Sequence, residues 1–128
     1  MQSHPDVLEV RCTLGAVERR WEAVLAAAEV LLASAPDRCS GWVDRSYSLH
    51  ELKRTQEAWD KLLPAVRLFP GVHIIPFNLA CYACQLGRMK EAREWLAAAM
   101  KVSRRDIILA MALSDLDLEP LWPELARM

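Results

Sequence analysis

Glycine is scarce in this sequence, with 4 residues among 128, and long apolar runs are missing. No window of eighteen consecutive apolar residues occurs, so no segment has the length and hydropathy of a membrane-spanning helix. The first ten residues, MQSHPDVLEV, contain no basic region followed by an apolar stretch, so we expect no secretory signal peptide. These absences predict a cytoplasmic protein that does not bind membranes.

A strong net charge is also missing. The formal net charge is -1 and the pI is near 6.3, which excludes the broad positive field that attracts phosphate backbones. We therefore expect no nucleic-acid partner. The composition, with 53% hydrophobic and 26% charged residues, is typical of a folded globular protein. A chain of 128 residues suits one domain over residues 1–128.

The apolar residues recur at every third or fourth position, as in Trp21, Val24, Leu25, Ala28 and Leu31. This spacing predicts amphipathic α-helices. No convincing run of alternating β-branched residues occurs. The stretch VHII at residues 72–75 is a short candidate, but a proline follows it directly, and we interpret it as the start of a helix.

The sequence also repeats with a period of 34 residues. A shift by this interval aligns Pro36 with Pro70. Further sets of positions agree at the same interval: Val24, Ala58 and Ala92; Ala28, Leu62 and Leu96; Leu31, Ala65 and Ala99; Arg19, Lys53 and Gly87. The copies cover residues 5–38, 39–72 and 73–106, approximately.

Each copy predicts two helices joined by a tight link, ERR, LKR or LGR. Small residues on the second helix allow the two backbones of a hairpin to approach closely: Ala58, Ala65, Ala92 and Ala99. The prolines at positions 36 and 70 stop the second helix. Pro64 lies inside a predicted helix and removes an amide that would bond to Asp60, so we expect a kink there.

These positions resemble the tetratricopeptide repeat (TPR) family, in particular small bacterial TPR proteins. The third copy, NLACYACQLGRMKEAREWLAAAM, keeps four positions of the family pattern: Leu79, Gly87, Ala92 and Ala99. The second copy keeps Trp42, Ala58, Ala65 and Pro70, and the first is degenerate, with Leu8, Val24 and Leu31 in the corresponding columns. The resemblance implies an all-α fold, an α-α superhelix of three TPR-like helical hairpins.

Residues 107–128, IILAMALSDLDLEPLWPELARM, leave the period, and we interpret them as a C-terminal capping segment. We expect a first short helix with an apolar face formed by Ile107, Leu109, Ala110 and Leu113. We expect Pro120 in the first turn of a final helix. The inner face of that final helix would consist of Leu121, Trp122 and Leu125.

The sequence has 4 cysteines, too few for a disulfide framework in a chain of this length. Cys81 and Cys84 lie one helical turn apart, but zinc normally requires four ligands and no second pair is present. A redox pair needs a thiol at the start of a helix, and these two lie in its middle. We interpret both as small apolar residues of a helix wall. A cysteine-based metal or redox site is a remote alternative, and we expect no cofactor.

The TPR register implies a concave groove lined by the first helix of each copy. It places on the groove wall Asp6, Glu9 and Thr13 from copy one, Val43, Asp44, Tyr47 and His50 from copy two, and Ile74, Phe77, Asn78 and Cys81 from copy three. One end of this wall is acidic and the other apolar. Well-known TPR domains hold a C-terminal carboxylate with basic side chains, whereas Glu9 and Asp44 here would repel one.

No glycine-rich phosphate loop, serine elbow or paired-carboxylate motif is visible, and we expect no enzyme activity and no catalytic residues. The sequence favours a non-catalytic scaffold that binds a partner peptide or helix in its groove. Electrostatic complementarity makes that segment basic at one end and apolar at the other. The alternative is a homodimer that buries the apolar groove or the first hairpin.

Overall fold

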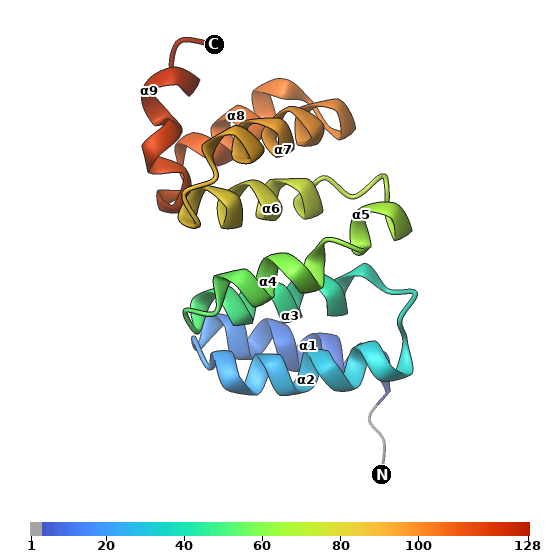
Figure 1. Cartoon of the computed structure of the whole chain (residues 1–128). Helices are drawn as coiled ribbons and strands as arrows, with labels where there is room; N and C mark the ends of the chain where they lie inside the picture. The colour runs from blue at the N-terminus through green and yellow to red at the C-terminus, as the bar shows by residue number, and fades with distance from the viewer. Residues whose placement is uncertain (1–3) are drawn as a thin grey trace. The chain divides into compact units, whose positions relative to one another are not determined.

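The computed structural model describes residues 4–128, and within this range the chain is helical, without a β-strand (Figure 1). The all-α prediction is therefore confirmed. The longer helices are α1 (Pro5–Val17), α2 (Trp21–Ser34), α3 (Cys39–Glu51), α4 (Thr55–Leu62), α6 (Ile74–Gln85) and α7 (Met89–Val102). The shorter ones are α5 (Ala65–Leu68), α8 (Arg105–Leu113), the 3-10 helix η1 (Leu116–Leu121) and α9 (Trp122–Leu125). Within the described residues, no helix is long and apolar enough to cross a membrane.

The contacts within the chain form two compact units, the first ending at Ala65 and the second beginning at Val66. In the first unit α1 packs on α2, and α3 packs on α2 and α4. In the second unit α6 packs on α7, and the C-terminal segment packs on both helices of that hairpin. A single domain over residues 1–128 remains a prediction.

The three links between paired helices have the same backbone conformation. The residues at the reversal are Arg19, Lys53 and Gly87, with φ of 57°, 66° and 78°. In each link the next amide donates to a carbonyl five residues earlier, as Arg20 N does to Gly15 O at 2.8 Å. This combination of a left-handed residue and a long-range amide bond is the Schellman motif, which ends a helix and satisfies its last carbonyls. The helices α2, α4 and α7 consequently begin 34 residues apart, at Trp21, Thr55 and Met89.

Small residues lie at the contacts between helices, as the alanine pattern predicted. Ala58, Ala65, Ala92 and Ala99 are fully buried. A Cβ atom added to Gly41 on α3 would lie 3.0 Å from Leu32 Cγ on α2, so these two backbones are close together. Leucine is the commonest of the larger core side chains, and the core of each hairpin is apolar.

Pro64 separates α4 from α5. The first of these helices ends at Leu62 and the second begins at Ala65, so the predicted kink is a full interruption. The cause is the missing amide of Pro64 and the clash of its ring with the preceding turn. The last backbone bond before the break runs from Leu63 N to Trp59 O, at 3.0 Å.

The C-terminal segment folds back onto α6 and α7 through apolar and polar contacts. Leu121 and Leu125 are buried as predicted, and half-buried Trp122 donates from Nε1 to Ala112 O at 2.8 Å. Two predictions in this segment, the apolar face of α8 and the place of Pro120, are wrong. On α8, Ile108 and Ala112 are buried, whereas Ile107, Ala110 and Leu113, which were expected to face inward, are exposed. Pro120 lies inside η1, and Pro123 occupies the first turn of α9.

Candidate functional site

The first unit brings several predicted wall residues together at the contact between α1 and α3. The carboxyl group of Asp44 on α3 interacts electrostatically with Glu9 and Cys12 on α1. The Cys12 thiol itself lies 3.9 Å from Val24 O on α2. Burial raises the pKa of Asp44, and the negative charge of Glu9 raises it further, while the Cys12 contact lowers it. Burial, followed by the charge of Asp44, raises the pKa of the Cys12 thiol to about 12. The Cys12 side chain therefore stays a neutral thiol at neutral pH.

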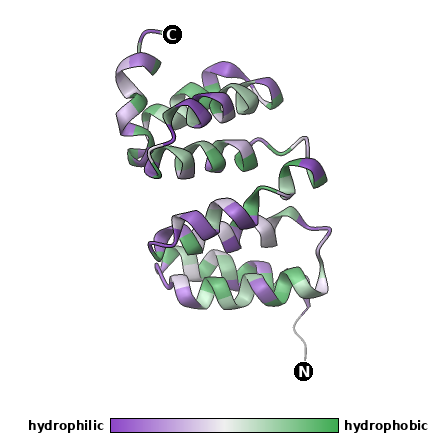
Figure 2. Cartoon of the chain, viewed as in Figure 1, coloured by the Kyte–Doolittle hydropathy of each residue, from purple (hydrophilic) through white to green (hydrophobic). Residues whose placement is uncertain are grey.

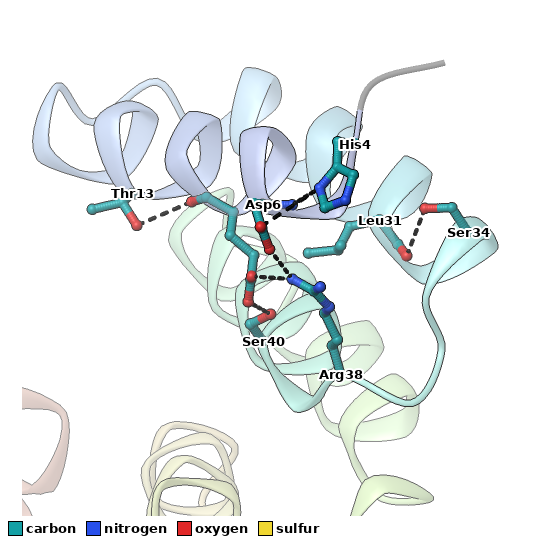
Figure 3. A network of polar contacts seen from close by, with 8 residues as sticks. His4, Asp6, Thr13, Leu31, Ser34, Arg38 and Ser40 are labelled. Atoms are coloured by element: carbon teal, nitrogen blue, oxygen red, sulfur yellow. Dashed lines mark hydrogen bonds and ion pairs between the residues drawn. The ribbon is translucent and has the colours of Figure 1, made fainter.

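An arginine that the sequence analysis did not place at the wall neutralises part of its acidic charge (Figure 3). Arg38 Nη1 donates to Asp6 Oδ1 at 2.7 Å and to Glu9 Oε1 at 2.6 Å. Ser40 Oγ donates to the second oxygen of Glu9. Because of Arg38 the pKa of Asp6 is lowered. Arg38 lies at the junction of two repeats, and no local sequence pattern indicated its contact with α1.

The other predicted wall residues of the first unit differ in how much they expose. Tyr47 is 39% exposed, and its ring lies edge-on to Trp21, with centroids 5.4 Å apart and planes at 70°. Thr13 is exposed and donates to the carbonyl of Glu9 at 3.0 Å, and Val43 is half-buried.

His50, in contrast, is buried, with Nδ1 2.9 Å from Thr55 Oγ1. This contact joins the end of α3 to the start of α4. His50 therefore connects the two helices of its hairpin. Tyr47 and Thr13, in contrast, are exposed to solvent.

In the second unit the predicted wall residues lie on α6. Phe77, Asn78 and Cys81 are buried, with 3%, 6% and 3% of their surfaces exposed. Ile74, in the first turn of the helix, is half-buried. The helix is buried over most of its length. The spacing of its apolar residues therefore could not show which side faces a groove and which faces the core.

The two cysteines of α6 have different neighbours. Cys81 Sγ lies 3.7 Å from Asp115 Oδ2, whereas Cys84 Sγ lies 3.8 Å from Met89 Sδ. Burial raises the pKa of both thiols, and the carboxylates of Asp115 and Asp117 raise that of Cys81 further. A redox cysteine needs the opposite, a pKa lowered by positive charge or a helix start. The surroundings of both thiols are therefore those of buried packing residues.

One group within residues 4–128 has ligand atoms close enough to share a metal ion: Cys81, Asp115 and Asp117, all within 4.8 Å of one another. The signal for the two carboxylates was the SDLD stretch, which the sequence analysis used only as a break between helices. Zinc binds cysteine as the thiolate, and the raised pKa of Cys81 opposes that form. The contacts instead show a thiol that donates to Asp115, which itself accepts from Asp117 N at 3.0 Å.

Comparison with known proteins identifies the fold. No protein-family model matches the sequence, and no curated protein matches it. A solved structure described as the TPR2B-domain:pHsp70-complex of yeast Sti1 matches 96% of this chain and 96% of that one, with a TM-score of 0.76 and 17% sequence identity. The chain therefore has a TPR-like fold, as the repeat pattern predicted. At this identity the likeness extends to the fold alone.

Proposed function

We propose that the chain is a non-catalytic, cytoplasmic protein–protein interaction module. Its partner is a peptide or helix of another protein. The receiving wall of the first unit consists of Glu9 and Thr13 on α1, with Val43, Asp44, Tyr47 and His50 on α3. In the second unit the candidate contact residues are Ile74, Phe77, Asn78 and Cys81 on α6. Within this set, the exposed side chains make direct contact, and the buried ones hold the helices that carry them.

Asp44 is the observation that carries this proposal. Its carboxyl group is half-buried beside Glu9, and both burial and that neighbouring charge raise its pKa. Ionised Asp44 is therefore an unfavourable feature of the free protein. A lysine or arginine from a partner would offset this cost by pairing with Asp44, and Arg38 is already engaged by Asp6 and Glu9. The partner segment is accordingly basic where it meets α1 and α3.

Two further features support the choice of a peptide or helix. Tyr47 presents part of an aromatic ring next to this acidic position, and exposed aromatic residues are frequent anchors in protein interfaces. A TPR-like domain, that of Sti1, is described in complex with pHsp70, so the fold supports binding to another protein. Ile74 supplies apolar contact on α6, and we expect the partner to be apolar there.

An array of short synthetic peptides of varied charge and apolar content tests the proposal. Peptides that combine a basic end with an apolar end should bind the purified chain most tightly. The strongest of them, titrated by calorimetry, should lose about tenfold or more in affinity with Tyr47→Ala and with Asp44→Asn.

Leu116→Ala is the matched control, because Leu116 is 72% exposed and lies outside the wall. It should leave the affinity unchanged. Equal binding by acidic peptides, or unchanged affinity in both wall variants, would remove the proposal. Phe77→Ala is unsuitable for this purpose, since truncating a buried phenylalanine measures stability.

A further inference from the structure

Helix α1 has apolar side chains on two opposite faces. One face packs on α2 through Leu8 and Cys12. The other carries four exposed apolar residues at spacings of three and four: Val7, Val10, Leu14 and Val17. This second face is called the α1 ridge below. A helix with apolar side chains on two faces is normally covered on both, yet within the described residues the ridge is open, and Val17 is 77% exposed.

A groove lies beside the α1 ridge, between α1 and α2. It encloses about 680 Å³, and its α2 side consists of Ala23, Ala26, Ala27 and Val30. The α1 side contains Leu8, Arg11, Leu14, Gly15 and Glu18. Figure 2 shows both helices largely in hydrophobic colours. The three alanines on the α2 side leave room for an apolar helix to approach the α2 backbone closely.

The shape of this surface is complementary to itself. Bulky valine and leucine side chains form the ridge, and three alanines with Val30 form the α2 side of the groove next to it. A twofold axis places the ridge of each molecule in the groove of the other, so one patch supplies both halves of the contact. No second kind of protein is needed to fill the groove.

The charges beside the groove have the same symmetry. Arg11 and Glu18 are seven residues apart, which places them two turns apart on one flank of the helix axis. In an antiparallel contact centred between Leu14 and Gly15, positions equally distant from the centre face each other. Arg11 of each molecule then faces Glu18 of the second copy. Within one molecule Glu18 also lies 3.6 Å from Arg20, an exposed and therefore weak ion pair.

We propose that the α1 ridge and its groove bind a second copy of this chain, in a twofold contact with the two α1 helices antiparallel. The contact uses Val10, Leu14 and Val17 on α1, whereas the wall of the proposed function uses Glu9 and Thr13 of that helix. The chain therefore presents two binding surfaces on α1, one for another copy and one for a partner segment.

Sedimentation velocity on the full chain, over two decades of micromolar concentration, tests this contact. Wild-type protein should be a dimer, and Val17→Glu should be monomeric, with unchanged helix content by circular dichroism. Leu116→Glu is the matched control, since it places the same charge on an exposed leucine of η1, and it should remain dimeric. A wild-type chain that stays monomeric, or a Val17→Glu variant that stays dimeric, would overturn the proposal.

Charge reversal tests the antiparallel register. Arg11→Glu and Glu18→Arg should each weaken the dimer by about tenfold, because each creates two like-charge contacts. The double variant restores both pairs with their signs exchanged, and should regain most of the wild-type affinity. A double variant no tighter than either single one would overturn the register. Peptide binding to the Asp44 wall, measured on the monomeric Val17→Glu variant, should persist, so failure of one proposal is distinguishable from failure of the other.

Discussion

At the scale of single residues, the links between paired helices show how one backbone conformation is met by different side chains. The left-handed position of the Schellman motif favours glycine, which has no Cβ to clash with the neighbouring carbonyl. The third link has Gly87 there, with φ of 78°, whereas the first and second have Arg19 and Lys53. Both side chains are exposed, so no buried contact offsets the free-energy cost of the left-handed backbone at these two residues.

We predict that Arg19→Gly stabilises the protein by about 0.5–1 kcal/mol, since it removes a left-handed non-glycine residue. Gly87→Ala should cost about 1 kcal/mol, although an added Cβ would meet no atom within 4 Å. Urea unfolding measures both changes. Arg20→Gly is the control, because Arg20 is exposed in the same link but has φ of -93°, and it should give no gain.

A second prediction at this scale concerns pH. The pKa of Asp44 is raised above its usual value of 3.8, chiefly by burial, so the folded protein holds this proton more tightly than the unfolded chain. The ionised carboxylate therefore costs stability, and this cost develops as the pH rises through the raised pKa. Below about 3.8 the group is protonated in both states and the cost disappears.

Asp44→Asn should accordingly be more stable than wild type at neutral pH, with a difference that shrinks as the pH falls toward 4. Urea unfolding across this range measures the difference. Asp60→Asn is the control, because Asp60 is exposed on α4. A difference that does not depend on pH, or a less stable Asp44→Asn variant at neutral pH, would contradict the assignment.

The residue scale is also where prediction from the sequence was weakest. Ile107 and Ile108 are neighbouring isoleucines, so hydropathy does not distinguish them. The way α8 packs on its neighbours decides that Ile108 is the buried one. Arg38 reaches α1 across 29 residues of chain, from position 38 to Glu9, and no local pattern specifies that pairing. The assignment of His50 to a groove wall followed the repeat register, which does not include its contact with Thr55. Side-chain partners depend on tertiary packing that periodicity does not encode.

At the scale of elements, Pro64 decides where a helix stops. The alanine pattern of α4 and α5 is that of one continuous second helix, with Ala58 and Ala65 both buried. The proline interrupts it at the one turn where the amide is missing. The division between the two compact units falls directly after this break, at Ala65.

We predict that Pro64→Ala joins α4 and α5 into one helix. The restored amide can donate to the carbonyl of Asp60, and stability should rise by about 1 kcal/mol, less than the ~3 kcal/mol of an unrelaxed interior proline. Circular dichroism at the helix band should show increased helicity. Pro5→Ala serves as the control, because Pro5 lies in the first turn of α1, where a proline removes no bond of the helix, and it should add no helix. Equal helicity in wild type and Pro64→Ala would contradict this cause of the break.

The elements themselves were the most predictable level of the structure. The spacing of apolar residues gave the helical class, and the shared link positions gave the starts of α2, α4 and α7. These signals are local, because a helix buries a periodic face and a Schellman turn involves six residues. The C-terminal segment has neither a repeat nor a long period, and its 3-10 helix was missed for that reason.

At the scale of the whole molecule, a repeated helical hairpin provides the fold. The TPR-like fold followed from the 34-residue period, and the likeness to the TPR2B domain of Sti1 supports it at a TM-score of 0.76. Within the described residues, the features that point to function are surfaces: the acidic position of Asp44 with Tyr47, and the α1 ridge with its groove. The sequence predicted the first as part of a longer wall, and for the second it offered the alternative of a homodimer that buries the apolar groove or the first hairpin.

The central claim is that α1 and α3 present a wall that binds a basic peptide segment. Amide NMR spectra of the Val17→Glu chain, recorded during titration with the tightest peptide from the array, test it most directly. We predict that the largest shift changes occur at Thr13, Val43, Asp44 and Tyr47. Changes concentrated instead at Ala23, Ala26 and Val30, or spread evenly over the chain, would contradict it.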